Sequence, residues 1–215
     1  MNHGTWKSTA LLAGALLIVS DTAASAEGGS VTTSPGEKSL AISTDTVRVL
    51  HRSVKIDAEF ELFTHALEKI LGRFPEGVQQ DIIERPQVAK ELLKAAEGAQ
   101  QLMIFSVLDH GAALNLVGAR RNAKQYLIGN PLTAIQMSQH DIRAALYAPL
   151  RVLVYKPKAG HTIVEYDQPS SLFGQFGRKD VTEVALTLDT KLEKAIAQAA
   201  DLTRRWRRGP PHAAN

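Results

Sequence analysis

The pattern of apolar and polar residues along the chain predicts several short strands. Apolar and polar residues alternate over residues 46–56, which is typical of a strand with one buried face. Residues 125–128 and 150–155 are short apolar runs, and residues 162–166 alternate again after a turn at Lys158-Ala159-Gly160. Short runs bounded by glycine, asparagine or proline are typical of strands, so we expect the last two runs to form a hairpin.

The most continuous apolar run covers residues 103–108 and stops at Asp109, His110 and Gly111. A short run that ends at a glycine is typical of a buried strand, and we expect this run to be the central core strand. Neighbouring side chains on a strand point to opposite faces. Asp109 and His110 should therefore not bond directly unless the backbone turns at Gly111.

Apolar residues at helical spacing predict the helices between these strands. The order of elements is β-α-α-β-α-β-α-β-β-α-α, which indicates an α+β fold around a small mixed sheet. Asp57 and Asp180 are candidate caps of the first and last helices. The predicted helices cover residues 57–71, 86–97, 112–119, 133–148 with a break near Ser138, and a long C-terminal segment that begins at Asp180.

The N-terminus has the pattern of a secretory signal. A short apolar run, Ala10 to Ser20, is followed by Ala24-Ser25-Ala26, and the small residues match a signal-peptidase site. We expect a signal peptide at residues 1–26, a disordered leader at 27–44 and a periplasmic or secreted mature protein. An uncleaved N-terminal anchor is the alternative; after cleavage no stable membrane anchor is expected.

Composition narrows the function classes further. The chain has 215 residues and no cysteine, which excludes disulfides, thiolate nucleophiles and cysteine metal sites. The net charge of +3 is too small to indicate a nucleic-acid partner. Four arginines lie between residues 204 and 208, where they favour a helix C-terminus. Residues 209–215 are expected to form a disordered tail.

Four motifs in order carry a resemblance to the DUF302 family: Val107-Leu108-Asp109-His110, Leu127-Ile128-Gly129-Asn130-Pro131, the run from Pro149 to Tyr155, and Gly160 with Tyr166-x-x-Pro169. The resemblance covers about residues 45 to 176. It implies an α+β fold in which a small curved, mainly antiparallel sheet packs against helices, and it implies a homodimer. The biochemical role of the family is generally unassigned, so the resemblance implies a fold and leaves the function open.

The chain departs from the family pattern in ways that set the expected domain bounds. We expect a DUF302-like domain at 45–178 with an added helical segment at about 73–99, and a C-terminal helix at 179–208. Tyr147 stands where the family usually has an acidic residue. This departure counts against a general acid/base site.

The candidate site is a pocket at the end of the 103–108 strand, with Asp109 and His110 as its floor. His110 is the candidate metal or haem-iron ligand, with a pKa that also suits acid/base chemistry. The alternative has Asp109 capping the helix that begins near Gly111, and His110 buried and bonded to backbone carbonyls. The expected rim is Gly129-Asn130-Pro131, whose following helix start favours anions. The expected walls are Tyr147, Tyr155 and Tyr166.

Three functions remain open from these residues. The leading hypothesis is an exported, non-enzymatic domain that binds a small ligand of unknown identity, with haem or a metal held through His110 as one version. The second is a hydrolase-type or other acid/base enzyme that uses Asp109 and His110. The third is a self-associating structural or interaction module that forms a homodimer through its sheet.

Overall fold

A computed structural model describes residues 40–208 of the chain. The predicted signal peptide, most of the predicted leader and the predicted tail lie outside these residues. Asp45 begins the structural unit that contains all the strands and helices of the described residues, and the fold below is the fold of that unit. No helix within residues 40–208 is both long and apolar enough to cross a membrane.

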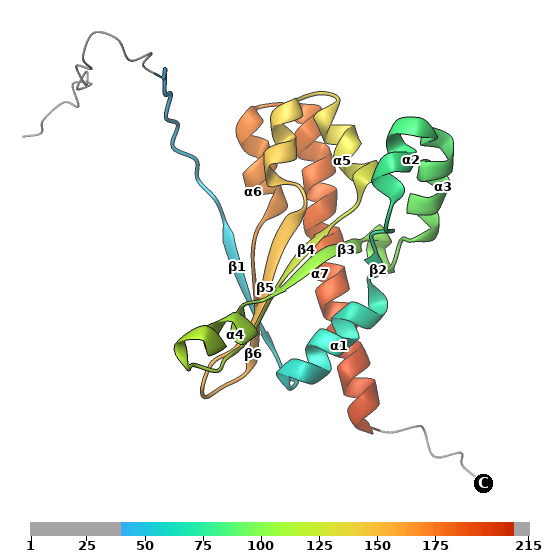
Figure 1. The fold of residues 1–215 in the computed structure, drawn as a ribbon. Helices are drawn as coiled ribbons and strands as arrows, with labels where there is room; N and C mark the ends of the chain where they lie inside the picture. The colour runs from blue at the N-terminus through green and yellow to red at the C-terminus, as the bar shows by residue number, and fades with distance from the viewer. Residues whose placement is uncertain (1–39, 209–215) are drawn as a thin grey trace, which may run out of the picture. The chain divides into compact units, whose positions relative to one another are not determined.

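Six strands form one sheet in the order β1-β6-β5-β4-β3-β2 (Figure 1). All neighbours are antiparallel except β2 and β3, which run parallel. The mainly antiparallel α+β fold expected from the sequence is therefore confirmed. The strands are β1 His51–Ile56, β2 Gly72–Arg73, β3 Met103–Asp109, β4 Asn122–Gly129, β5 Leu150–Lys156 and β6 Thr162–Asp167.

Seven α-helices and four short 3-10 turns lie between and after the strands within the described residues. The long C-terminal helix expected from the sequence is confirmed as α7. The α-helices are α1 Phe60–Ile70, α2 Val78–Glu84, α3 Pro86–Ala95, α4 His110–Ala113, α5 Pro131–Ser138, α6 Pro169–Phe173 and α7 Lys179–Arg208. The 3-10 turns are Ala99–Gln101, Leu114–Val117, Ile142–Tyr147 and Gly174–Phe176.

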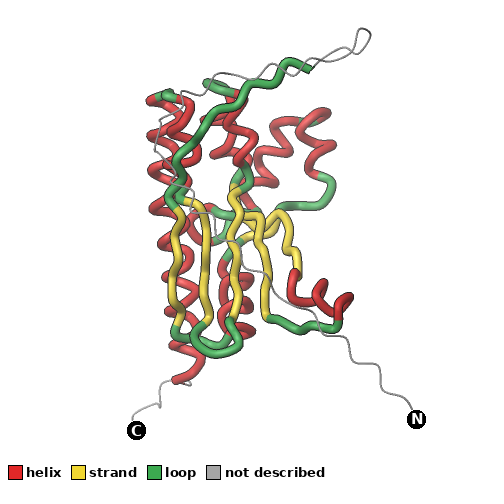
Figure 2. The backbone as a smooth tube through the Cα atoms, turned by 90° about the vertical axis from the view of Figure 1, so that its left-hand side faces the viewer, coloured by secondary structure: helices red, strands yellow, loops and turns green. Residues whose placement is uncertain are grey.

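The core lies between one face of the sheet and the helices α1 and α7. Phe63 and Leu67 of α1 and Leu192 of α7 are fully buried there, together with Val152 and Val164 of the sheet. Figure 2 shows the long helix α7 behind the strands and α4 beside their lower right ends, and no helix of residues 45–208 covers the opposite sheet face. We call this opposite face the open face.

The position of β3 corrects the expectation that it is the central strand. β4 and β5 are central, whereas β3 is second from the edge and pairs with the two-residue β2 only at Met103 and Ile104. Leu108, in the part of β3 that β2 does not reach, is 45% exposed. The apolar run is thus buried at its start and approaches solvent at its end.

Several helix ends also differ from the sequence prediction. Glu59 rather than Asp57 is the N-cap residue of α1, while Arg207 of α7 donates to the backbone carbonyl of Asp57. α7 begins at Lys179, one residue before the predicted cap Asp180. The break predicted near Ser138 is confirmed, because α5 ends there and a 3-10 turn follows.

Candidate functional site

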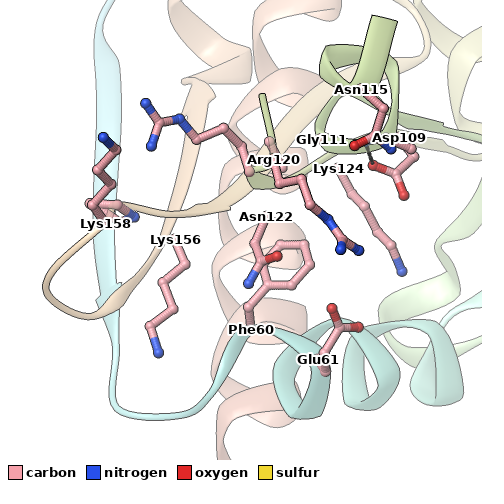
Figure 3. A pocket seen from close by; sticks show the side chains of 14 residues that line it. Phe60, Glu61, Asp109, Gly111, Asn115, Arg120, Asn122, Lys124, Lys156 and Lys158 are labelled. Carbon is pink, nitrogen blue, oxygen red and sulfur yellow. Dashed lines mark hydrogen bonds between the residues drawn. The ribbon is translucent and has the colours of Figure 1, made fainter. Parts of the chain in front are cut away.

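A cleft of about 580 Å³ opens where β3 ends and β4 begins (Figure 3). In Figure 3, Lys156 and Lys158 stand on one side, Lys124 and Asp109 on the other, and Glu61 of α1 approaches from below. We call it the basic cleft. Its lining residues are Phe60, Glu61, Asp109, Gly111, Ala112, Asn115, Arg120, Arg121, Asn122, Ala123, Lys124, Lys156, Pro157 and Lys158.

Antiparallel pairing brings these residues together from distant parts of the sequence. Asp109 at the end of β3 pairs with Lys124 of β4, and Asn122 at the start of β4 pairs with Lys156 at the end of β5. The ends of β3 and β5 therefore meet the start of β4 at one end of the sheet. Lys158 follows from the turn between β5 and β6.

Asp109 and Gly111 fix the upper wall of the basic cleft. The Asp109 carboxylate caps α4 by accepting a hydrogen bond of 2.7 Å from the Ala112 amide. A Cβ atom on Gly111 would lie 2.0 Å from the carbonyl oxygen of Arg121, which is far inside van der Waals contact. Only glycine lets α4 pack this closely against the chain that leads into β4.

Cations outnumber carboxylates in the basic cleft. Five lysine and arginine side chains line it against Glu61 and Asp109. Lys156 pairs with Glu59, and Lys124 Nζ lies 3.5 Å from Glu68 Oε1. The remaining three cations form no ion pair with any residue in the range 40–208; they are Arg120, Arg121 and Lys158.

Glu68 of α1 links Lys124 of the basic cleft to the core. Its carboxylate accepts a 2.9 Å hydrogen bond from the hydroxyl of the fully buried Tyr126, and it also faces Arg73 and Lys124. Burial raises the pKa of Tyr126 far above its usual value, and the negative charge of Glu68 raises it further. The Tyr126 hydroxyl therefore stays protonated and donates to the Glu68 carboxylate, which lies beside Lys124.

The structure places His110 outside the lining of the basic cleft. It is the first residue of α4 and its side chain is exposed. Among residues 40–208, no three His, Cys, Asp or Glu side chains converge in a way that would hold a metal ion. The capping alternative is thus right for Asp109 but wrong for His110, which is exposed and not buried. His110 joins no cluster of metal ligands in the described part of the chain.

The predicted rim lies at the other end of the same strand pair. Gly129 pairs with Met103, whereas Lys124 pairs with Asp109. At about 3.3 Å of rise per residue, the two ends of β3 are about 20 Å apart. The expectation that Gly129, Asn130 and Pro131 border the same pocket as Asp109 is not met, because antiparallel pairing separates them.

Gly129, Asn130 and Pro131 line a second, smaller cavity of about 210 Å³, which we call the apolar pocket. It lies between the sheet end, α5 and α7. The other lining residues are Phe105, Thr133, Ala134, Met137, Ala148, Pro149, Leu150, Phe173 and Leu188.

The side chain of Asn130 is engaged in internal hydrogen bonds. Its Nδ2 donates to Glu97 Oε1 (2.6 Å) and to the Gln101 carbonyl (2.8 Å), and its Oδ1 accepts from the Leu132 amide (2.8 Å). Asn130 is 5% exposed. These bonds join α5 to the chain before β3, so Asn130 has a structural role.

Replacing Asn130 with alanine should therefore lower the free energy of unfolding by about 2 kcal/mol, because buried polar groups lose their partners. Denaturant unfolding of the purified protein measures this change. Asn115→Ala is the matched control, since Asn115 is exposed, and it should leave the unfolding midpoint nearly unchanged. Equal midpoints for the two variants would contradict a structural role for Asn130.

The three predicted wall tyrosines lie in different places. Tyr147 packs edge-on against Phe173 with ring centroids 6.2 Å apart. Tyr155 donates a 3.0 Å hydrogen bond to Glu165, and this bond raises the pKa of Tyr155. Tyr166 is buried in the core, and burial raises its pKa. None of the three lines the basic cleft.

His51 of β1 gives a pH-dependent contact on the open face. Its Nδ1 lies 3.0 Å from Asp167 Oδ1, and Glu165 is 3.6 Å from Nε2. The hydrogen bond to Asp167 raises the pKa of His51 above 6.5. This contact stabilises the fold fully below the unfolded-state pKa, and its contribution is lost as pH rises through the folded-state pKa.

An NMR titration of the imidazole protons should give His51 a pKa above 6.5, and Asp167→Asn should return that pKa toward the unshifted value. The side chain is exposed, so the effect on stability is small. Identical titration curves in the two proteins would show that Asp167 does not hold the imidazolium.

Sequence reasoning found Asp109 but missed the cations of the basic cleft. Arg120-Arg121 after Gly118, and Lys156 with Lys158 around a hairpin turn, are ordinary surface patterns when read singly. Their common position follows from the β3–β4–β5 register. One sequence feature could have indicated this cluster of cations: each pair lies close to the end of a predicted strand.

The fold defines a class of protein: an α+β domain with a mainly antiparallel sheet and helices on one face. The family model DUF302, a domain of unknown function, matches residues 82–199, which is more than half of the chain. The chain therefore belongs to the DUF302 family, and the resemblance stated from its motifs is confirmed. The match starts inside α2 and ends inside α7. Both its start and its end therefore lie later in the chain than those of the predicted domain, residues 45–178.

The fold also occurs in solved structures. One of them is the crystal structure of an uncharacterized conserved DUF302 protein from Bacillus stearothermophilus, with a TM-score of 0.51 and 13% sequence identity. The similarity covers 69% of this chain and 97% of that one. At this identity the likeness shows the fold alone. No curated protein matches the chain.

Proposed function

We propose that this DUF302 protein is an exported, non-enzymatic domain that binds a small anionic ligand in the basic cleft. One observation carries the proposal: Arg120, Arg121 and Lys158 line a single cleft without forming an ion pair within residues 40–208. Like charges gathered in this way repel one another, and a bound anion would relieve that repulsion.

The size and chemistry of the basic cleft support a small molecule. A volume of about 580 Å³ falls within the range of about 300 to 1,000 Å³ that is usual for small-molecule sites. Guanidinium groups bind carboxylate and phosphate oxygens with two parallel hydrogen bonds. Asn115 and Asn122 add neutral hydrogen-bonding groups that suit hydroxyls or further oxygens of the ligand.

The same geometry favours binding over acid/base catalysis. His110 lies outside the cleft lining, and one Asp109 oxygen accepts the Ala112 amide. The basic cleft therefore lacks the pair of groups that the enzyme hypothesis needs. A metal site through His110 gains no support, because no three His, Cys, Asp or Glu side chains converge among residues 40–208.

Calorimetric titration of the mature protein with inorganic pyrophosphate, citrate and ATP tests the proposal. Binding of at least one of these anions is expected, and added salt should weaken it because the cleft residues are partly exposed to solvent. Uncharged sugars of similar size serve as the control ligands. Failure of all three anions to bind at low ionic strength would refute anion binding in this cleft.

A second candidate function is self-association through the open face. Leu127, Leu153 and Ile163 lie half-buried on adjacent strands of that face, which no helix of residues 45–208 covers. We propose that two copies stack these faces in a homodimer. Light scattering should give a dimer mass for the wild type and a monomer mass for Leu153→Lys. A wild-type monomer at every concentration would rule this candidate out.

A further inference from the structure

The apolar pocket is a second cavity that the anion-binding proposal does not use. It lies near Gly129, at the end of the β3–β4 pair opposite the basic cleft. Phe105 of β3, Met137 of α5, Phe173 of α6 and Leu188 of α7 supply its walls. Four separate elements therefore border one apolar pocket of about 210 Å³, which is partly open to solvent.

The chemistry of this lining excludes an anion as its occupant. No ionisable side chain lines the apolar pocket. The amides at the start of α5 are all used: Leu132 donates to Asn130 Oδ1, and Thr133 and Ala134 donate to the Asn130 carbonyl at 3.1 and 2.9 Å. The helix start expected to favour anions therefore has no free amide in its first turn.

The apolar lining and the volume instead specify an uncharged ligand of limited size. Engineered apolar cavities of about 150 Å³ in other proteins stay dry and bind benzene. A volume of about 210 Å³ accepts one aromatic ring with a small addition. Apolar walls without partner atoms forfeit dispersion contacts, and a ring-shaped ligand would restore them.

We propose that the apolar pocket binds an uncharged, ring-sized apolar molecule, and that this site works independently of the basic cleft. The ligand class is that of benzene or indole. The phenyl ring of Phe105 is held in place because it stacks on Phe74 with ring centroids 4.5 Å apart. A fixed ring in the wall favours aromatic ligands through offset or edge-on packing.

NMR spectra of the methyl groups test this site with indole as the probe. Saturable shifts are expected at Met137 and Leu188 in the wild-type protein. Ala134→Leu places a larger side chain into the pocket and should weaken indole binding about tenfold or more, as expected from steric filling. Ala197→Leu makes the same change on the exposed surface of α7 and should retain wild-type affinity.

Two outcomes would overturn the proposal: no saturable shift at Met137 or Leu188 in the wild type, or unchanged indole affinity in folded Ala134→Leu. The wild-type spectra decide the question even if the variant does not fold. Pyrophosphate binding to the same samples reports on the basic cleft, so failure of one site is distinguished from failure of the other.

Discussion

Replacing Gly98 with alanine is expected to lower the free energy of unfolding by about 3 kcal/mol, near the upper end for added volume in a packed site. A Cβ atom on Gly98 would lie 2.0 Å from the Gly72 nitrogen and 2.4 Å from the Leu71 carbonyl carbon. Backbone atoms cannot rotate away as a flexible side chain does. The two chain segments would have to separate.

That separation would break hydrogen bonds that hold the added helical segment to the sheet. The amides of Gly72 and Gly98 both donate to the Leu102 carbonyl, at 3.0 and 3.2 Å. Leu102 directly precedes β3. The Gly72–Gly98 contact therefore positions the start of β3 as well as the end of α3.

Chemical denaturation of Gly98→Ala beside the wild type measures this effect. Gly174→Ala is the control, because the nearest atom to its added Cβ is 4.0 Å away and its backbone is helical. The control should be neutral or slightly stabilising. If the two variants unfold at the same denaturant concentration, the close approach of the backbones does not limit stability.

Reversing two charges in the basic cleft should remove most anion binding. The double variant Arg120→Glu with Arg121→Glu is expected to weaken pyrophosphate affinity by about 100-fold or more, since each charged hydrogen bond contributes about 1.5 kcal/mol or more. Both residues lie in the loop before β4, outside the core. The thermal midpoint should therefore change little.

The matched control is Arg204→Glu with Arg205→Glu near the end of α7, which changes the net charge equally but lies outside the cleft lining. It should keep nearly wild-type affinity at moderate salt, where distant charges are screened. Equal losses in the two double variants would mean that overall charge, and not the cleft, governs binding.

Local patterns in the sequence predicted most of the strands and helices but not the position of β3. The runs that became β5 and β6 have clear turn residues at both ends, so their hairpin could be expected. β2 has only two residues, too few for any periodicity. The expectation that β3 is central was wrong because an apolar run indicates burial but carries no information on strand order.

The candidate site was predictable only in part, for a similar reason. Asp109 preceded a glycine and an apolar turn, and its capping role followed from that local pattern. Arg121 and Lys158 are far apart in sequence, and only the pairing of β3, β4 and β5 brings their segments together. The same register separates Gly129 from Asp109, so the predicted pocket divided into two cavities.

Amide proton–nitrogen correlation spectra during a pyrophosphate titration test the anion-binding account most directly. If the anion binds in the basic cleft, saturable shifts should concentrate at residues 120–124 and 156–158, with little change at the start of α5. Shifts that cluster elsewhere, or spectra that do not change at low ionic strength, would contradict anion binding in this cleft.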